Sequence, residues 1–298
     1  MDAALFQAPR RRMIRLADGE MAALEFGDAA RPVDAVFLHA NGFNALTYRS
    51  VLGPLSLSLR LLAVDMRGHG ASRLPADPKG RKSWKDLRDD LLALLQEVAE
   101  APVVLAGHSM GATVALMAAV ERPAAVRSLA LFDPVVPSAW AALSAKAPWL
   151  FAGLWGRTAA ARTARDRRAV FDSFTSAFKA YCGRGLFRSW PEIMLADYIA
   201  AGFREQSGGE VELTCTPAWE ASNLAARAND PSSALRRLRL PTQIFRAEHG
   251  SACRLRPGSA LLRWNPRVRL SVVAGAGPSL PMERPDVVRD AILDAAEV

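Results

Sequence analysis

The chain has 298 residues and 50% of them are apolar, which is enough to bury a sizeable core. Its net charge of +8 comes from arginines spread along the chain without a nucleic-acid-binding motif, so we expect no nucleic-acid partner. No run approaches the roughly 18 apolar residues of a membrane span, and residues 1–15 carry no signal-peptide pattern. Three widely spaced cysteines fit neither a disulfide framework nor a zinc site and favour the cytoplasm: Cys182, Cys215 and Cys253.

The first half of the chain alternates short apolar runs with helical patterns, which predicts a mostly parallel sheet. Residues 13–16 and 21–26 predict an N-terminal hairpin around the turn at 17–20. Further strands are predicted at 35–38, 61–64, 103–106 and 129–132, and helices at 83–98, with Ser83 as its cap, and at 112–120.

The pattern changes after Pro134. Residues 135–231 show helical stretches, no core strand, and five of the seven tryptophans: Trp140, Trp149, Trp155, Trp190 and Trp219. Strands return at 241–245 and 268–273, and a helix at 286–297 closes the chain. We therefore predict a core of residues 1–134 and 232–298, interrupted by a helical lid at 135–231.

The sequence Gly107-His108-Ser109-Met110-Gly111 lies between a predicted strand and a predicted helix. A G-x-S-x-G motif in this context forms a sharp turn that lifts the serine hydroxyl above the sheet, at the N-terminus of the helix. The glycines are needed because a side chain at either position would clash with the neighbouring strand or helix. We predict Ser109 as a nucleophile whose helix favours developing negative charge.

A second motif, His39-Ala40-Asn41-Gly42-Phe43, follows the strand at 35–38. Acyl transfer needs two amides aimed at the developing oxyanion. We predict that the N–H groups of Met110 and Asn41 form this oxyanion hole, although a plain glycine turn would carry the same residues. The motif Asp65-Met66-Arg67-Gly68-His69-Gly70 is interpreted as a structural turn, because a catalytic base must reach Ser109 from another loop.

Together these motifs, the helical insertion and the two returning strands resemble the α/β-hydrolase superfamily from about residue 12 to 298. The similarity is to bacterial esterase and lysophospholipase-like members, which have a lid after the sixth core strand. The resemblance implies an α/β-hydrolase fold with a mostly parallel sheet of about eight strands. It also implies catalytic residues in the order serine, acid, histidine.

The family's acid often follows the seventh core strand, where this chain has Gly250. Another acid position follows the sixth strand and is occupied by Asp133, our preferred candidate. An aspartate before a proline is also a common turn signal. Glu248 is the weaker alternative.

The family's histidine follows the last core strand in a G-x-G-H pattern. This chain reads Gly275-Ala276-Gly277-Pro278 there, and proline can neither accept the serine proton nor protonate a leaving group. Of its four histidines, His39, His69 and His108 belong to other motifs. Only His249 lies in a loop that faces the expected triad, so it is the candidate for a migrated base, or else a surface histidine with no catalytic role.

Two hypotheses follow. The chain is a serine hydrolase that forms an acyl-enzyme at Ser109 on an apolar or aromatic carboxylic ester, impaired by Pro278. Alternatively it is an inactive homologue, or an engineered variant without its histidine, that binds a small apolar ligand or a partner. Dehalogenase and epoxide hydrolase chemistry would need an aspartate at position 109. No phosphate-binding glycine loop or metal-ligand cluster is present in the sequence, so we expect no cofactor or metal.

Overall fold

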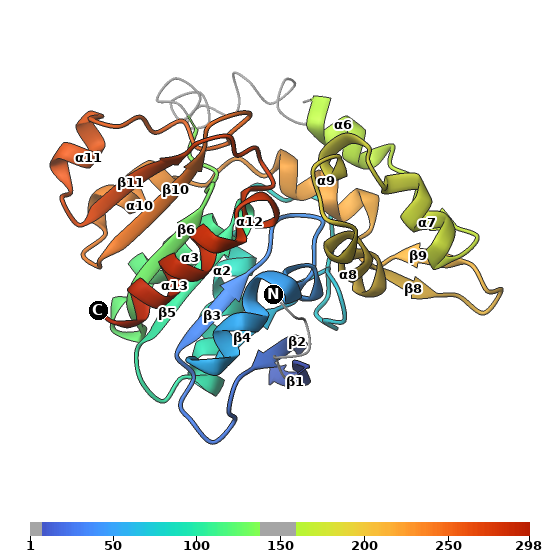
Figure 1. The fold of residues 1–298 in the computed structure, drawn as a ribbon, viewed down its shortest axis with the longest axis horizontal. Helices are drawn as coiled ribbons and strands as arrows, with labels where there is room; N and C mark the ends of the chain where they lie inside the picture. The colour runs from blue at the N-terminus through green and yellow to red at the C-terminus, as the bar shows by residue number, and fades with distance from the viewer. Residues whose placement is uncertain (1–7, 138–158) are drawn as a thin grey trace.

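A computed structural model describes residues 8–137 and 159–298, and its centre is one eight-stranded sheet (Figure 1). The strand order is β1-β2-β4-β3-β5-β6-β10-β11. The strands are β1 (Arg10–Leu16), β2 (Gly19–Phe26), β3 (Ala35–Leu38), β4 (Leu61–Val64), β5 (Val103–His108), β6 (Val126–Phe132), β10 (Thr242–Ala247) and β11 (Val268–Val273).

The sheet is antiparallel at one edge and parallel elsewhere. The β1–β2 hairpin is antiparallel, and β2 pairs antiparallel with β4. From β4 to β11 every neighbouring pair is parallel. The loops that follow these parallel strands therefore meet at one edge of the sheet, which is where ligands bind in open α/β sheets.

Helices cover both faces of the sheet, and alternate strand residues feed two cores. Val36 and Leu38 pack with helices of one face, whereas Ala35 and Phe37 pack with the other. The first face carries α2 (Lys85–Val98), α3 (Met110–Glu121) and α10 (Pro231–Arg237), and the second carries α1 (Arg49–Leu52) and α13 (Pro285–Ala296). Two short helices, α11 (Ala260–Trp264) and α12 (Leu280–Glu283), flank β11 in the chain.

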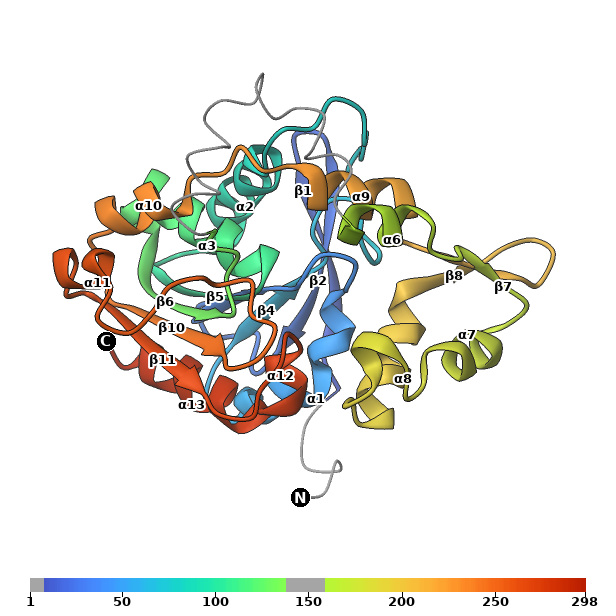
Figure 2. The same ribbon diagram turned by 90° about the horizontal axis from the view of Figure 1, so that it is seen from above.

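In the segment between β6 and α10, residues 159–213 lie on the opposite side of the molecule from α11 and β11 (Figure 2). The segment contains a small antiparallel sheet of order β7-β9-β8 in addition to helices. The predicted helical lid therefore also contains strands. Its elements are α6 (Ala159–Arg165), β7 (Val170–Phe171), α7 (Phe174–Tyr181), α8 (Glu192–Gly202), β8 (Phe203–Glu205), β9 (Val211–Leu213) and α9 (Pro217–Ala225).

The predicted fold class is confirmed, with differences at the ends of elements. Helix α3 begins at Met110, two residues before its predicted start, and β5 continues to His108. The cap predicted at Ser83 is wrong. Helix α2 begins at Lys85, and the backbone N–H of Trp84 donates to Asn229 Oδ1 at 2.8 Å. Within the described ranges, no helix is long and apolar enough to cross a membrane.

Candidate active site

Ser109 occupies the turn between β5 and α3 in a strained conformation. Its φ is 52°, in the left-handed region that non-glycine residues rarely adopt, and it is half-buried. A Cβ added at Gly111 would lie 2.5 Å from the Leu38 carbonyl oxygen, and one added at Gly107 would lie 2.7 Å from the backbone of Gly111. Only glycine fits both positions, and the turn places Ser109 at the N-terminus of α3.

The two predicted oxyanion donors are the N–H groups of Met110, directly after Ser109, and of Asn41, in the loop after β3. Among the described residues, no acceptor is bonded to the backbone N–H of Asn41 or of Met110. The next amide along the loop, that of Gly42, donates to His69 Nε2 at 3.1 Å and is therefore occupied. The geometry leaves Asn41 and Met110 as the N–H groups that could meet an oxyanion, and this role stays a prediction.

Two buried histidines hold the loop at Asn41 against the loop after β4. His39 Nε2 accepts from the Met66 N–H at 3.0 Å, and its Nδ1 lies 2.7 Å from the Ala40 carbonyl oxygen. His69 Nδ1 lies 2.9 Å from the Arg67 carbonyl oxygen. Burial lowers the pKa of His39 to about 4 and that of His69 to about 3. Both rings are therefore neutral, and both nitrogens of each ring form hydrogen bonds that hold these loops in place.

His108 connects the end of β5 with the position where the family has its histidine. Its Nε2 lies 2.8 Å from the Pro278 carbonyl oxygen, and its Nδ1 lies 2.8 Å from the Tyr48 hydroxyl. Because the carbonyl can only accept, His108 carries its proton on Nε2 and accepts from Tyr48 at Nδ1. Burial lowers the pKa of His108 to about 4. His108 is thus a neutral structural group, and Pro278 lies beside the Ser109 turn.

Asp133 lies at the end of β6, buried and with a φ of 47°. Its Oδ1 accepts from the Ala247 N–H at 3.0 Å and from the Ser251 hydroxyl, and its Oδ2 accepts from the Ala252 N–H at 3.2 Å. The carboxylate therefore orders the loop after β10. A carboxylate has about four acceptor sites, so Oδ2 keeps room for one more donor. Sequence reasoning missed Ser251, which nothing local marks as a partner of Asp133.

The loop after β10 meets Pro278 without supplying a base. A Cβ added at Gly250 would lie 3.1 Å from Pro278 Cγ, so the family's usual acid and histidine positions are adjacent here. The His249 side chain is 70% exposed, and its Nε2 lies 3.5 Å from Glu248 Oε2. No hydrogen bond joins the described side chain of His249 to Asp133 or Ser109. Its role as a migrated base stays a prediction.

Helix α9 contacts the Asn41 loop directly, which the sequence did not predict. Asn41 Nδ2 donates to the Glu220 carbonyl oxygen at 3.0 Å, and Asn223 Nδ2 donates to Asn41 Oδ1 at 2.9 Å. Asn223 is fully buried and its Oδ1 has no donor. A Cβ added at Gly42 would lie 2.8 Å from Glu220 Oε1, so the Glu220 carboxylate also packs on this loop.

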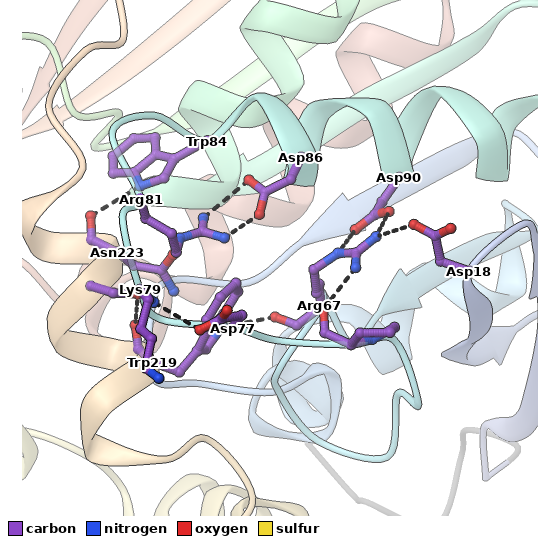
Figure 3. A network of polar contacts seen from close by, with 12 residues as sticks. Asp18, Arg67, Asp77, Lys79, Arg81, Trp84, Asp86, Asp90, Trp219 and Asn223 are labelled. Carbon is purple, nitrogen blue, oxygen red and sulfur yellow. Dashed lines mark hydrogen bonds and ion pairs between the residues drawn. The ribbon is translucent and has the colours of Figure 1, made fainter.

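A polar network holds α9 in this position (Figure 3). Trp219 Nε1 donates to the Arg67 carbonyl oxygen at 3.0 Å, and the Arg67 guanidinium donates to both oxygens of Asp90, at 2.6 and 2.8 Å. The Arg81 guanidinium lies 3.9 Å from the centre of the Trp219 ring. Trp84 Nε1 donates to the Asn223 carbonyl oxygen at 3.0 Å. Helix α9 is thereby joined to α2 and to the loop after β4.

Aromatic side chains of the insertion line up beside Phe43, at the end of the same loop. The Trp190 ring meets the Phe43 ring edge-on at 5.2 Å between centroids, and the Tyr198 ring does so at 5.8 Å. Trp190 Nε1 is buried without a hydrogen-bond partner. Of the tryptophans predicted for the lid, Trp190 and Trp219 are buried, and Trp140, Trp149 and Trp155 lie outside the described residues.

Nothing in residues 8–137 and 159–298 groups three or more His, Cys, Asp or Glu side chains in a way that could hold a metal ion. All three cysteines fall in these ranges and are free thiols.

The sequence and the structure of this chain are similar to those of known hydrolases. The family model described as the alpha/beta hydrolase family matches residues 35–291. The chain is 26% identical over 257 residues to 2-(acetamidomethylene)succinate hydrolase of Mesorhizobium japonicum, covering 86% of this chain and 85% of that protein. A crystal structure of E-2-(acetamidomethylene)succinate hydrolase superposes with a TM-score of 0.75 at 23% identity, covering 97% of this chain and 100% of that one.

A shorter similarity involves a lipase. The chain is 38% identical over 112 residues to the sn-1-specific diacylglycerol lipase ABHD11 of Mus musculus. This match covers 36% of the chain and 34% of the lipase, so it spans only about a third of that relative.

Proposed function

We propose that this chain, which belongs to the alpha/beta hydrolase family, is a carboxylic-ester hydrolase. In the proposed reaction it forms an acyl-enzyme at Ser109, and Pro278 slows it because a proline replaces the expected histidine. The observation that carries the proposal is the strained, half-buried Ser109 turn at the N-terminus of α3. A turn of this kind serves to present a nucleophile above the sheet.

In the proposed acylation, Ser109 Oγ attacks the acyl carbon and a tetrahedral intermediate forms. The bond from the acyl carbon to the leaving oxygen then breaks, and the alkoxide or phenolate takes any proton it needs from water. The N–H groups of Asn41 and Met110 would stabilise the oxyanion, together with the dipole of α3. In the absence of a paired histidine, the serine proton passes to solvent. A leaving group that departs as an anion, such as p-nitrophenolate, needs no protonation and is therefore the best substrate for detecting this step.

The second step, hydrolysis of the acyl-enzyme, needs a base to activate water. Loss of the histidine in a serine triad costs on the order of a millionfold in turnover, while binding and the oxyanion hole retain roughly a thousandfold over water. We expect slow turnover with an acyl-enzyme that accumulates.

The proposed substrate is a small apolar or aromatic ester. The edge-on contacts of Trp190 and Tyr198 with Phe43 support it, since they put apolar rings next to the loop that carries Asn41. The lipase and hydrolase names of the relatives support acyl chemistry in general. We also propose residues 135–231 as a lid on a core of residues 1–134 and 232–298, supported by the separate small sheet in the insertion.

A second candidate function is ligand binding without catalysis. It is favoured by the residues at two adjacent positions, Gly250 and Pro278. The family usually has its acid at the first position and its histidine at the second, and this chain has neither. The bond from His108 to the Pro278 carbonyl further ties this loop to β5. Such a protein would bind small apolar molecules and leave esters intact.

The test is the reaction with p-nitrophenyl acetate, following p-nitrophenolate release and the intact mass of the protein. The proposal predicts a burst of about one equivalent, a stable acetyl adduct on Ser109, and the loss of both in Ser109→Ala. The same measurement on His249→Ala tests the migrated base: a slower reaction would identify His249 as the base. Equal traces for the wild type and Ser109→Ala, with no adduct, would reject the proposal in favour of ligand binding.

A further inference from the structure

One end of the molecule carries a cluster of exposed arginines. It is formed by α10, α11 and β11, which lie on the opposite side of the molecule from α7 and α8 in both views (Figures 1 and 2). We call this surface the basic end, defined by the exposed residues Arg236, Arg237, Arg239, Arg263, Arg267 and Arg269.

The fold brings these arginines together from two stretches of chain. Asn265 Nδ2 donates to the carbonyl oxygens of Leu235 and Leu238, both at 2.8 Å, which ties the end of α11 to the end of α10. Strand β11 then continues beside β10 in parallel register. Positions 236–239 and 263–269 consequently lie at one end of the molecule, although the sequence showed only scattered arginines. Arg269 alternates along β11 with Val268 and Leu270, so it lies on the α13 side of the sheet.

The charge of the basic end is not neutralised locally. Glu248 is the only acidic residue between positions 231 and 274. None of the six arginines forms an ion pair with a side chain in the described ranges. By contrast, three arginines of β1 are paired: Arg10 and Arg12 with Glu25, and Arg11 with Asp65. Arg263 Nη1 donates to the Gly258 carbonyl oxygen at 2.8 Å. Because none of the six has an acidic partner among the described side chains, their positive charge can attract an external anion.

A groove runs into the basic end. It has a volume of about 380 Å³ and is lined by Arg267, Arg269, Thr242, Gln243 and Val298, among others. The two guanidinium groups suit a phosphate, because arginine binds phosphate oxygens through two parallel N–H donors. The groove thus has the size and donors for a small anionic head group.

The same surface exposes apolar groups. The Trp264 side chain at the end of α11 is 83% exposed, although most of the described tryptophans are buried, and Val272 on β11 is 40% exposed. An indole gains free energy by leaving water, and tryptophan prefers the interface between lipid head groups and acyl chains. Free phosphate would bind arginines alone, whereas a lipid surface would also cover Trp264.

We infer that the basic end docks the protein on a membrane surface rich in anionic phospholipids. Trp264 enters the interface, Arg267 and Arg269 bind a lipid phosphate in the groove, and the other arginines of the basic end add attraction to the charged surface. Helices α7 and α8 lie on the far side of the molecule, so docking leaves them away from the bilayer.

The experiment is sedimentation of the purified chain with vesicles of phosphatidylcholine alone or with a quarter phosphatidylglycerol, at roughly 0.1 M salt. We compare the triple variant Arg263→Gln, Arg267→Gln and Arg269→Gln with a charge-matched control that changes three exposed arginines of the inserted segment to glutamine: Arg162, Arg184 and Arg188. The expected result is binding to the anionic vesicles only, weakened roughly a hundredfold by the first triple and little by the control.

The single variant Trp264→Ala separates a membrane from another polyanion. It leaves every charge in place, so weaker vesicle binding by roughly tenfold supports insertion of the indole. A short single-stranded DNA is tested in parallel. The inference is wrong if the wild type ignores anionic vesicles, if the two triples lose binding equally, or if Trp264→Ala binds vesicles as well as the wild type. Tighter binding to the DNA than to vesicles would likewise overturn it, in favour of a nucleic-acid surface.

Discussion

Replacement of Pro278 by histidine is the sharpest perturbation of the proposed chemistry. The Pro278 carbonyl oxygen lies 2.8 Å from His108 Nε2, so position 278 is adjacent in space to the residue before Ser109. This bond uses the backbone and survives the substitution. The side chain at 278 is exposed and faces Gly250, which has no side chain to obstruct an imidazole.

The expected gain follows from the role of a general base. A positioned base contributes typically about 100-fold to 10,000-fold, and Asp133 Oδ2 has an acceptor site left to orient it. We expect Pro278→His to raise the steady-state rate on p-nitrophenyl acetate by about a thousandfold, which corresponds to about 4 kcal/mol of barrier. The base acts only in its neutral form, the ordinary pKa of histidine is about 6.5, and the Asp133 carboxylate raises it. The rate should therefore rise as the pH increases above about 6.5.

Pro278→Gln is the matched control, since it also removes the proline ring but supplies no base. Ser109→Ala in the Pro278→His background must abolish the gain. The reasoning is refuted if Pro278→Gln accelerates the reaction as much as Pro278→His, because release of the backbone would then explain the effect. An unchanged rate in a folded Pro278→His variant would reject Asp133 as the acid or 278 as the histidine position.

Three further outcomes are expected. Asn223→Ala removes the side chain that holds Asn41 and should lower the Ser109-dependent burst rate about tenfold. The free energy of unfolding should fall by only about 1 kcal/mol, because Asn223 Oδ1 is already unpaired. Gly111→Ala places a Cβ 2.5 Å from backbone oxygens and should destabilise the fold by about 3 kcal/mol, measured by urea unfolding. Stability should fall as the pH drops from about 6.5 to about 4, because burial depresses the pKa values of three histidines in the folded protein below the unfolded value: His39, His69 and His108.

Each outcome has a control. Asn229→Ala removes hydrogen bonds just beyond the C-terminal end of α9, without touching Asn41, and should leave the burst rate unchanged. An equal effect of the two substitutions would mean general loosening of this end of the helix. Gly208→Ala meets nothing within 4 Å and should be neutral in urea. For the pH profile, the sign follows from proton uptake: between these pH values the unfolded chain binds protons that the neutral buried rings do not. Stability that is flat from pH 6.5 to 4 would show that the rings are protonated in the folded state.

Local patterns along the chain were sufficient to predict the fold class and the Ser109 turn. The apolar run 35–38 coincides with β3, because a strand buried on both faces must be apolar throughout. The mixed run 268–273 coincides with β11, an edge strand that is largely exposed. The glycines at 107 and 111 are required by the turn itself, and the proline at 278 is visible by its place after the last strand. These features depend on neighbours in the sequence, so the sequence alone determined them.

Contacts between distant segments were decided by the tertiary structure alone. The hydrogen bond from Asn223 to Asn41 joins residues far apart in the chain, and Asp133 binds donors from the loop after β10. The residues around Asn223 and Asp133 in the sequence do not predict these partners, because the partners depend on how the insertion and the strands pack. The basic end follows the same principle: residues 236–239 and 263–269 lie at one end of the molecule because the bonds of Asn265 tie α11 to α10.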